Sequence, residues 1–301
     1  MRIDFHSTPM LRDGQPAIIA AAWIDAAALA DLPAERLARH LALFRKIRFD
    51  ALLCRGDATA APPWLDRAKQ IAAHAGCTLV LVNAPPLTGT GAGFESAAPE
   101  IWPDSLHEIE TAGLAIVPIG MLVTAWARRI ASGATCWATN LLARPLPEGD
   151  PQPAETLVRT LHRLQSFARK QGDLLLRSNP LATGRGWSAL ATPPRVELTL
   201  RQLDAKPVWT VFAINPSPFP AVGPLQVNLG DRAVDLGTVR IKPERFAVFQ
   251  ITADRRPATN RHRPLADLAR AKGQSKADAT RVNDLLKQGL RVRTLFRGTE
   301  V

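Results

Sequence analysis

The sequence predicts an α/β fold, then an antiparallel β-sandwich, then a short helical basic tail, and three patterns support this prediction. Residues 49–86 read as strand, loop, helix and strand, which is the βαβ unit of parallel sheets. After residues 178–194, a segment rich in Gly, Pro and Ser, the apolar spacing becomes alternating. The last part of the chain is strongly basic. We therefore expect domains at residues 1–180, 195–252 and 253–301.

The first 50 residues predict one strand and one helix. The apolar run 17–23 predicts a buried strand, and it follows a turn over residues 12–16 in which Gly14 supplies a positive φ. Residues 32–47 predict an amphipathic helix with Pro33 in its first turn, where proline is tolerated. The apolar stripe of this helix contains Leu37, Leu41, Phe44 and Ile47.

The βαβ unit follows and organises the rest of the α/β part. Residues 50–54 predict a buried strand, residues 64–74 a helix that begins after two prolines, and residues 78–82 a second strand. Polar residues at the carboxyl ends of parallel strands are where binding sites form. The residues in that position are Arg55, Asp57 and Asn83.

A glycine-rich loop is predicted after Pro86, with Gly89, Gly91 and Gly93 at alternate positions. Glycine lets backbone N–H groups approach a phosphate closely. However, the third glycine of the dinucleotide-binding pattern and the lysine of a P-loop are both missing. The pattern therefore favours a mobile loop over a site rather than nucleotide binding.

Three carboxylates, Glu95, Glu100 and Asp104, lie close together in sequence and accompany Trp102. Glycoside cleavage uses two carboxyl groups, one to protonate the leaving oxygen and one to attack or to activate water. The alternative is that these acids precede a helix from Asp104, where the helix dipole favours negative charge. We prefer the helix interpretation for Asp104 and keep Glu95 as a site candidate, because we expect it in the loop.

The middle of the chain predicts two more helices and then a set of short strands. Residues 115–131 predict a helix that ends near Gly133, a strand then ends at Asn140, and residues 154–176 predict a long helix. Beyond the connector, turn residues separate short runs of strand-like sequence, which is typical of an antiparallel sandwich. These runs are residues 195–203, 208–215, 225–229, 234–239 and 246–251.

The basic tail allows two interpretations. From residue 253 to residue 301, twelve Lys or Arg stand against five Asp or Glu, an excess of seven within a net charge of +11. Such a tail suits a nucleic acid, an anionic lipid or an acidic protein, and it equally suits a solvated surface extension. Residues 264–270 and 276–288 predict two helices whose spacing matches a helix-turn-helix only loosely.

Several classes of protein are disfavoured. The three cysteines have no paired spacing, and the six histidines are scattered, so we expect no disulfide framework, no metal and no cofactor. No apolar run is long enough to span a membrane, and the start lacks the order of a secretory signal. We therefore expect a cytoplasmic protein.

The order of parts resembles the glycoside hydrolases that have a (β/α)8 barrel and a C-terminal β-sandwich. Residues 10–16 resemble the turn with which many of these enzymes begin, and residues 49–54 resemble their second barrel strand. Residues 127–135 look like their late helix and last strand, and residues 208–216 and 243–249 look like strands of the appended sandwich. A full barrel needs about 250 residues, but far fewer precede the connector. The expected fold is therefore an abbreviated (β/α) barrel or an open parallel sheet.

This resemblance implies a carbohydrate-active protein that hydrolyses or binds a glycan or glycoside. The candidate acids and nucleophiles are Asp57, Glu95 and Glu100. The candidate substrate-binding residues are Arg55, Trp64, Asn83, Trp102, Trp137 and Asn140, although tryptophans more often pack in a core. The Asn-Glu pair of this family is missing, since Asn83 is followed by Ala84. A non-catalytic protein that docks a partner through its basic tail is the alternative.

Overall fold

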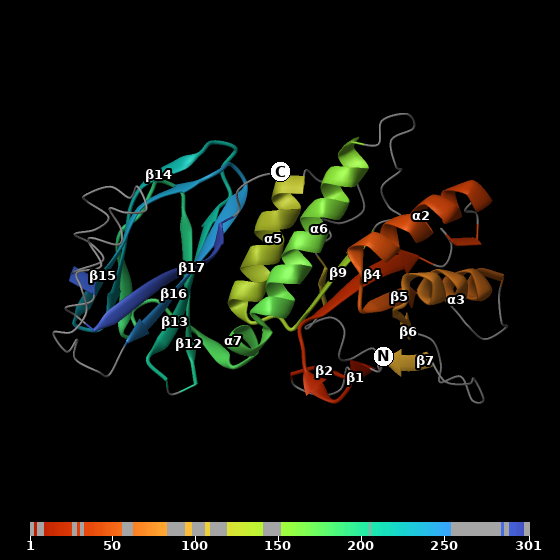
Figure 1. The fold of residues 1–301 in the computed structure, drawn as a ribbon, viewed down its shortest axis with the longest axis horizontal. Coiled ribbons are helices and arrows are strands. Elements are labelled where there is room, and N and C mark those ends of the chain that lie inside the picture. Colours follow the sequence, from red (N-terminus) through yellow and green to blue (C-terminus); the bar gives the residue numbers. More distant parts are fainter. Residues whose placement is uncertain are drawn as a thin grey trace, which may run out of the picture. The chain divides into compact units, whose positions relative to one another are not determined.

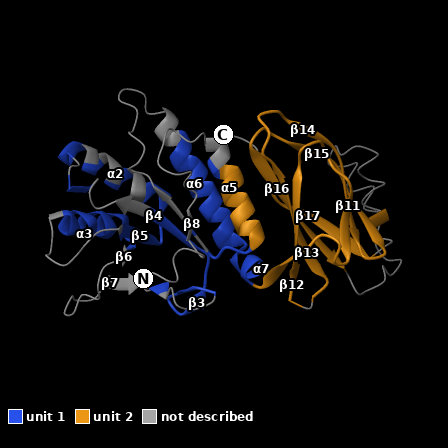
Figure 2. Ribbon diagram, turned by 180° about the vertical axis from the view of Figure 1, so that it is seen from behind, with its two compact units in different colours: residues 1–122, 133–176, 301 blue, residues 123–132, 177–300 orange. Residues whose placement is uncertain are grey.

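The fold is described from a computed structural model of the 301-residue chain. The structure describes residues 3–4, 9–25, 29–30, 33–55, 63–82, 94–97, 106–108, 119–140, 152–204, 206–253, 284–285 and 289–297. The chain divides into two compact units (Figure 2). Unit 1 comprises Met1–Leu122, Gly133–Leu176 and Val301, and unit 2 comprises Val123–Ser132 and Arg177–Glu300. Among the described helices, none is both long enough and apolar enough to cross a membrane.

Unit 1 is built from strands and helices that alternate along most of its length (Figure 1). Its strands are β1 (Ile3–Asp4), β2 (Leu11–Arg12), β3 (Gln15–Pro16), β4 (Ile19–Asp25), β5 (Ala51–Arg55), β6 (Thr78–Val82), β7 (Phe94–Ala97), β8 (Leu106–Glu108) and β9 (Cys136–Asn140). Its helices are α2 (Ala34–Ile47), α3 (Pro63–Ala75), α6 (Gln152–Lys170) and α7 (Gly172–Leu176). Helix α5 (Ile119–Ser132) contributes residues to both units.

Six of these strands form one sheet in the order β7-β6-β5-β4-β9-β8, and each neighbouring pair is parallel. From β4 to β7, each strand pairs with the one before it in the chain and lies on the same side of it. Strand β9 lies on that same side of β8, and it pairs with β4. This is the order that results when a ring of successive strands is opened between β7 and β8. A doubly wound sheet reverses direction at its switch point, and this order does not.

The helices of unit 1 form where the apolar spacing predicted them. Helix α2 buries Leu37, Leu41 and Ile47, and it packs beside both α3 and α6. Gly76 ends α3 with a φ of 68°, a conformation that glycine adopts without steric cost. Among the side chains that α3 and α6 bury are Leu65, Ala68, Ile71, Ala72, Leu161, Leu164, Phe167 and Ala168. The predicted strands 17–23, 50–54 and 78–82 are confirmed within two residues at each end.

Unit 2 contains two antiparallel sheets (Figure 1). Five strands have the order β10-β12-β13-β16-β17, and three have the order β11-β14-β15. The strands are β10 (Ser178–Leu181), β11 (Trp187–Ala191), β12 (Glu197–Leu203), β13 (Val208–Asn215), β14 (Ala221–Leu229), β15 (Arg232–Ile241), β16 (Arg245–Ala253) and β17 (Leu290–Arg297). One hydrophobic cluster draws side chains from both sheets, among them Val211, Val227 and Phe249.

The opposite face of the five-stranded sheet is also apolar. Trp126 of α5 lies 5.7 Å from Phe246 between ring centroids, and Phe246 stacks on Phe296 at 4.7 Å. Alternate residues of β13 therefore belong to different clusters: Val211 and Ala213 lie in the shared core, whereas Phe212 is on the other face. This explains why β13 is apolar at almost every position.

The structure differs from the sequence-based expectation in three segments. Strands β10 and β11 occupy much of residues 178–194, which were expected to be a connector. Strand β8 lies where a helix from Asp104 was expected. Strand β17 pairs with β16, so this part of the expected helical tail is extended. The physical reason is common to all three: long-range hydrogen bonding to a partner strand decides the conformation of a short segment.

Candidate functional site

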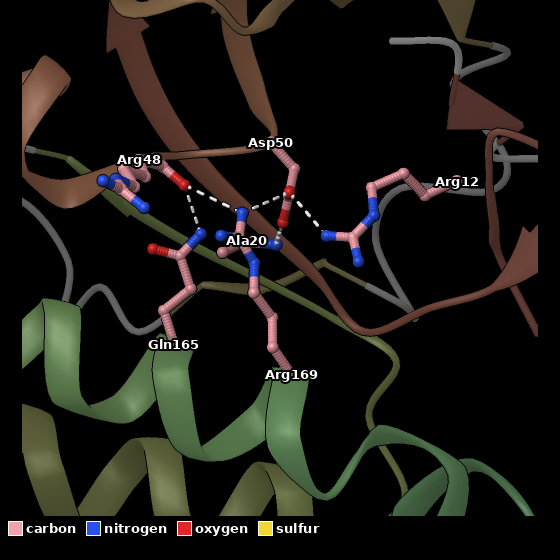
Figure 3. Close-up of polar contacts among 6 residues, drawn as sticks. All are labelled: Arg12, Ala20, Arg48, Asp50, Gln165 and Arg169. Atoms are coloured by element: carbon pink, nitrogen blue, oxygen red, sulfur yellow. Dashed lines mark hydrogen bonds and ion pairs between the residues drawn. The ribbon is translucent and has the colours of Figure 1, made fainter.

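The amino-terminal edge of the parallel sheet is organised around Asp50 (Figure 3). The Asp50 side chain is fully buried and accepts hydrogen bonds from Arg12 at 2.9 Å and from Arg169 at 2.7 Å. Its second oxygen accepts from the backbone N–H of Ala20 at 3.0 Å. Charge-assisted bonds of this length are the stronger class of protein hydrogen bond. Asp50 therefore joins β2, β4 and α6 at one buried point.

The backbone around Asp50 completes this network. The N–H of Asp50 donates to the carbonyl of Ala20 at 2.8 Å, and its carbonyl accepts from Thr78 at 3.1 Å, so it links β4 to β6. Arg48, with a φ of 58°, presents its carbonyl to the side chains of Gln165 and Arg169. These contacts fix the relative register of β4, β5 and β6. A structural role, rather than catalysis, fits a charged group with no exposed surface at this edge.

The carboxyl-terminal edge of the same sheet carries the polar residues that the sequence singled out. Arg55 is the last residue of β5, and Asn140 is the last residue of β9. Glu95 is in β7, although we expected it in a loop. In a parallel sheet, residues that are register partners belong to the same face, and so do residues two apart along a strand. The register can therefore place these residues on a face.

Two rows of register partners cross the sheet near this edge. The first row runs Asn140, Trp23, Leu53, Val80, Glu95 across β9, β4, β5, β6 and β7. The second row runs Asp25, Arg55, Val82, Ala97 across β4, β5, β6 and β7. The two rows are two residues apart, so they belong to one face. We call this face, with these two rows, the polar face.

The alternate face of the sheet is apolar. Leu52, Cys54, Leu79 and Trp137 occupy it, and each is at most 4% exposed. The polar face is also closed toward the middle of the sheet, because Ala21, Ala51 and Leu53 are fully buried on it. Three polar residues of that face, Asp25, Arg55 and Asn140, end their strands, which is where sites of parallel α/β folds form.

Asp25 and Glu108 belong to this face and were missed from the sequence. Asp25 is the last residue of β4 and the direct register partner of Arg55. Glu108 ends β8 and pairs with Ala138, which pairs in turn with Ala21. For Asp25 the available signal was an acidic residue two positions after the predicted strand 17–23.

Three tryptophans were predicted to stack on a sugar. The structure describes the side chains of two of them, and both are buried. Trp64 is 7% exposed and Trp137 is 1% exposed, and Trp137 makes an edge contact with Phe49 at 6.1 Å between centroids. Core packing is the role that tryptophans most often have. Both indoles thus contribute to the stability of unit 1.

Four predicted site residues lie outside the described residues: Asp57, Asn83, Glu100 and Trp102. Their assignment stays a prediction. Within the part of the chain that the structure describes, no three His, Cys, Asp or Glu side chains are grouped as a metal ion would require.

Unit 2 has a buried arginine and a basic strand. Arg201 is 3% exposed and donates to the hydroxyl of Ser178 and to the carbonyls of Ile130 and Ala131 at the end of α5. Burial lowers the pKa of Arg201 to about 10, so it keeps its charge at neutral pH. A cation at a helix C-terminus opposes the helix dipole favourably. The exposed arginines of β17 are Arg291, Arg293 and Arg297.

Comparisons with known proteins give only a weak likeness. No protein-family model matches the chain, and no curated protein sequence matches it. An α-amylase from Anoxybacillus is 14% identical over 73% of this chain, with a TM-score of 0.32. The α-amylase from Geobacillus thermoleovorans, solved with acarbose, is 11% identical over 72%, with a TM-score of 0.30. The chain spans 64% and 63% of the lengths of these two enzymes.

Proposed function

We propose that the chain is a carbohydrate-active protein whose glycan site lies on the polar face, at the carboxyl ends of β4, β5, β7 and β9. The observation that carries this proposal is the register of the sheet. In that register Arg55 and Asn140 end their strands, and Glu95, the second of four residues in β7, belongs to the same face, which supports a common site for these three residues. Carboxylate, guanidinium and amide groups together supply the acceptors and donors that sugar hydroxyls need.

The strand order supports a curled rather than a flat sheet. With right-handed crossovers, strands added always in one direction place their connecting helices on one face. The other face then stays without helices of its own, yet Ala21, Ala51 and Leu53 on the polar face are fully buried. We therefore propose that the sheet curls into an abbreviated (β/α) barrel with the polar face inside, and that the two sheets of unit 2 form the predicted β-sandwich.

In the hydrolytic form of this proposal, Glu95 works with a second carboxyl group, and Asp57 and Glu100 are the candidates. One acid protonates the leaving glycosidic oxygen, and the other carboxylate attacks the sugar or activates water. Asn140 and Arg55 bind hydroxyl groups and position the sugar. A chain that binds the same glycan without cleaving it retains the role of Asn140 and Arg55 and does not need a second carboxylate.

The test measures hydrolysis of a panel of aryl glycosides together with binding of the corresponding oligosaccharides. We expect Glu95→Gln to lower hydrolysis at least about a hundredfold, the usual minimum for loss of a general acid or base. Glu35→Gln, an exposed site on α2, is the matched control and leaves the rate unchanged. Equal rates for wild type and Glu95→Gln remove Glu95 from the mechanism. Absence of both cleavage and binding contradicts the proposal.

A second candidate function is the docking of an acidic protein or a nucleic acid through the basic C-terminal region. The observation that favours it is β17, at the end of the described five-stranded sheet, where three arginines are exposed. It predicts binding of a duplex DNA oligonucleotide or of poly-glutamate that weakens steeply as salt rises, because counterions are released. Replacement of all three arginines by Gln should abolish that binding. A flat salt response eliminates this candidate.

A further inference from the structure

The loop between β13 and β14 in unit 2 carries an exposed phenylalanine. The side chain of Phe219 is 66% exposed, and that of Val222, three residues further along, is 52% exposed. Pro218 and Pro220, on either side of Phe219, are exposed as well. Of the large hydrophobic side chains that the structure describes, only Leu190 is also exposed. Two of these three side chains therefore lie within four residues of each other, on this loop and at the start of β14.

Buried polar groups fix the backbone of this loop. The side-chain amide of Asn215, fully buried at the end of β13, donates to the carbonyl of Phe219 at 2.8 Å and to that of Lys242 at 3.1 Å. The hydroxyl of Ser217 accepts from the N–H of Phe219 at 3.2 Å, and its carbonyl accepts from the N–H of Glu244 at 3.0 Å. Both backbone polar groups of Phe219 are thus held while its ring is exposed. A partner of this ring does not have to order the loop, which lowers the cost of binding.

Exposed basic side chains lie beside this loop. Arg240 on β15 is the register partner of Val222, so the two side chains belong to the same face of this antiparallel pair. Lys242, whose carbonyl is tied to the loop, follows two residues later, and both basic side chains are exposed. The one acid among residues 240–245 is Glu244, which is half-buried and is followed by Arg245. The loop therefore combines an exposed aromatic ring with an excess of positive charge.

We propose that this loop docks the chain onto an anionic lipid bilayer, with Phe219 inserted among the head groups and with Arg240 and Lys242 against the lipid charges. Aromatic and aliphatic side chains gain free energy when they enter the boundary between head groups and acyl chains. Basic side chains next to them are attracted by the negative surface potential of such a bilayer. This docking site lies in unit 2 and does not depend on the glycan site proposed for unit 1.

The size of the apolar patch favours a bilayer over a protein partner. A stable protein–protein interface covers about 800 Å² and roughly twenty residues on each partner. Two exposed hydrophobic side chains and two prolines supply a small part of such an area. A bilayer requires no matching surface, because each inserted apolar side chain and each neighbouring basic residue adds its own contribution.

The kind of apolar residue favours a bilayer over a single-stranded nucleic acid. Such nucleic acids bind by stacking successive bases on several aromatic rings within a basic groove. Phe219 is an aromatic ring, but Val222 and the two prolines have no aromatic face on which a base could stack. Aliphatic and proline side chains do add apolar area that can enter the bilayer boundary. The composition of the loop thus suits insertion into lipid.

The test is co-sedimentation of the full chain with vesicles of phosphatidylcholine alone or of phosphatidylcholine mixed in equal parts with phosphatidylserine. We expect wild type to bind the mixed vesicles. Phe219→Ser should weaken this binding about tenfold, since it removes the inserted ring. The double variant Arg240→Gln, Lys242→Gln should weaken it about tenfold or more. All three side chains are exposed, so thermal unfolding of these variants should match that of wild type.

Matched controls replace similar residues elsewhere in unit 2. Leu190→Ser removes an exposed apolar side chain from β11. The double variant Arg185→Gln, Arg232→Gln removes two exposed charges near the opposite end of β14, where Arg232 pairs with Leu229. Both controls should bind the mixed vesicles nearly as wild type does. A separate variant, Phe219→Trp, places an indole on the loop, and lipids brominated in their acyl chains should quench its fluorescence more than that of wild type.

Several results would overturn the proposal. Wild type that binds neither kind of vesicle, or Phe219→Ser that binds the mixed vesicles as wild type does, removes the loop as a lipid-docking site. Equal quenching of wild type and Phe219→Trp shows that the ring stays outside the lipid. A concentration-dependent dimer that Phe219→Ser abolishes, without vesicle binding, assigns the loop to a second copy of the chain. Binding of poly(dT) that Phe219→Ser abolishes, again without vesicle binding, assigns it to nucleic acid.

Discussion

The buried carboxylate of Asp50 gives the sharpest prediction for stability. Asp50→Ala removes three hydrogen-bond acceptor contacts, to Arg12, Arg169 and the N–H of Ala20. A hydrogen bond to a charged group contributes about 1.5–3 kcal/mol. The arginine side chains are 30% and 35% exposed, so water compensates part of their loss, and we assign each about 1 kcal/mol. The buried N–H of Ala20 has no such compensation and accounts for about 1.5–2 kcal/mol.

We therefore expect Asp50→Ala to lower the free energy of unfolding by about 3.5–4 kcal/mol, within the range for breaking a buried ion pair. Asp50→Asn keeps one oxygen as an acceptor and should lose about 2 kcal/mol. Urea unfolding followed by tryptophan fluorescence measures both values. The control is Asp66→Asn, since Asp66 is 85% exposed and its contact with Lys69 is 3.5 Å long. If Asp50→Ala is no more destabilising than Asp66→Asn, the network does not stabilise the sheet.

Three further predictions follow from unit 2 and from the partly buried thiol of Cys77. Arg201→Met should lower the stability of unit 2 by about 3 kcal/mol in urea unfolding, because three or more carbonyl and hydroxyl acceptors lose their donor; a loss below about 1 kcal/mol contradicts this. Glu197→Gln should cost under about 1 kcal/mol, although its two bonds to Arg128 are 2.7 Å long, because both side chains are 46% exposed; a larger loss, or one that salt does not reduce, refutes it. Cys77, whose pKa burial raises to about 12, should react with Ellman's reagent at pH 8 roughly a thousandfold more slowly than in urea, because the reactive thiolate is scarce; equal rates would falsify the raised pKa.

The pKa of Cys77 also fixes the sign of a pH effect. Between pH 9 and pH 12 the unfolded chain loses the thiol proton while the folded chain keeps it. The folded state then binds more protons, so stability from this group is complete below pH 9 and falls as pH rises toward 12. Cys77→Ala should therefore unfold with a weaker dependence on pH in this range than wild type, and an unchanged dependence contradicts the assignment.

Local patterns were enough to predict the repeating part of unit 1. The spacing of Leu37, Leu41 and Ile47 defines a helical stripe within a few residues, and no distant contact is needed to recognise it. The same holds for the β-strands 78–82 and 208–215, whose apolar runs end at turn residues. Helix and strand identity follow from the sequence where the local period is strong.

Strand pairing could not be predicted in the same way. Strand β8 has only three residues, and it is a strand because Leu106 pairs with Cys136, thirty residues further along. Strand β17 follows a long segment and is extended because it pairs with β16. Such pairings depend on tertiary contacts and override weak local preference.

For the candidate site too, the local pattern could be predicted and the long-range pairing could not. Arg55 was found because it directly follows the predicted strand 50–54, and Asn140 because the predicted strand before it ends there. The neighbour of Arg55 could not be found, since only the register shows that Asp25 is its partner. Likewise, the role of Asp50 depends on Arg12 and Arg169, which are 38 and 119 residues away in sequence. Distance in the sequence concealed both arrangements.

Hydrogen exchange of the full chain with and without bound oligosaccharide tests most directly whether the carboxyl ends of the parallel strands hold the ligand. The probe is the oligosaccharide that binds most tightly in the panel. We predict added protection at the backbone of residues 24–25, 54–55, 96–97 and 139–140, with little change at the amino-terminal ends near residues 19 and 51. Protection confined to unit 2, for example at residues 215–222 or 290–297, would contradict a glycan site on the polar face.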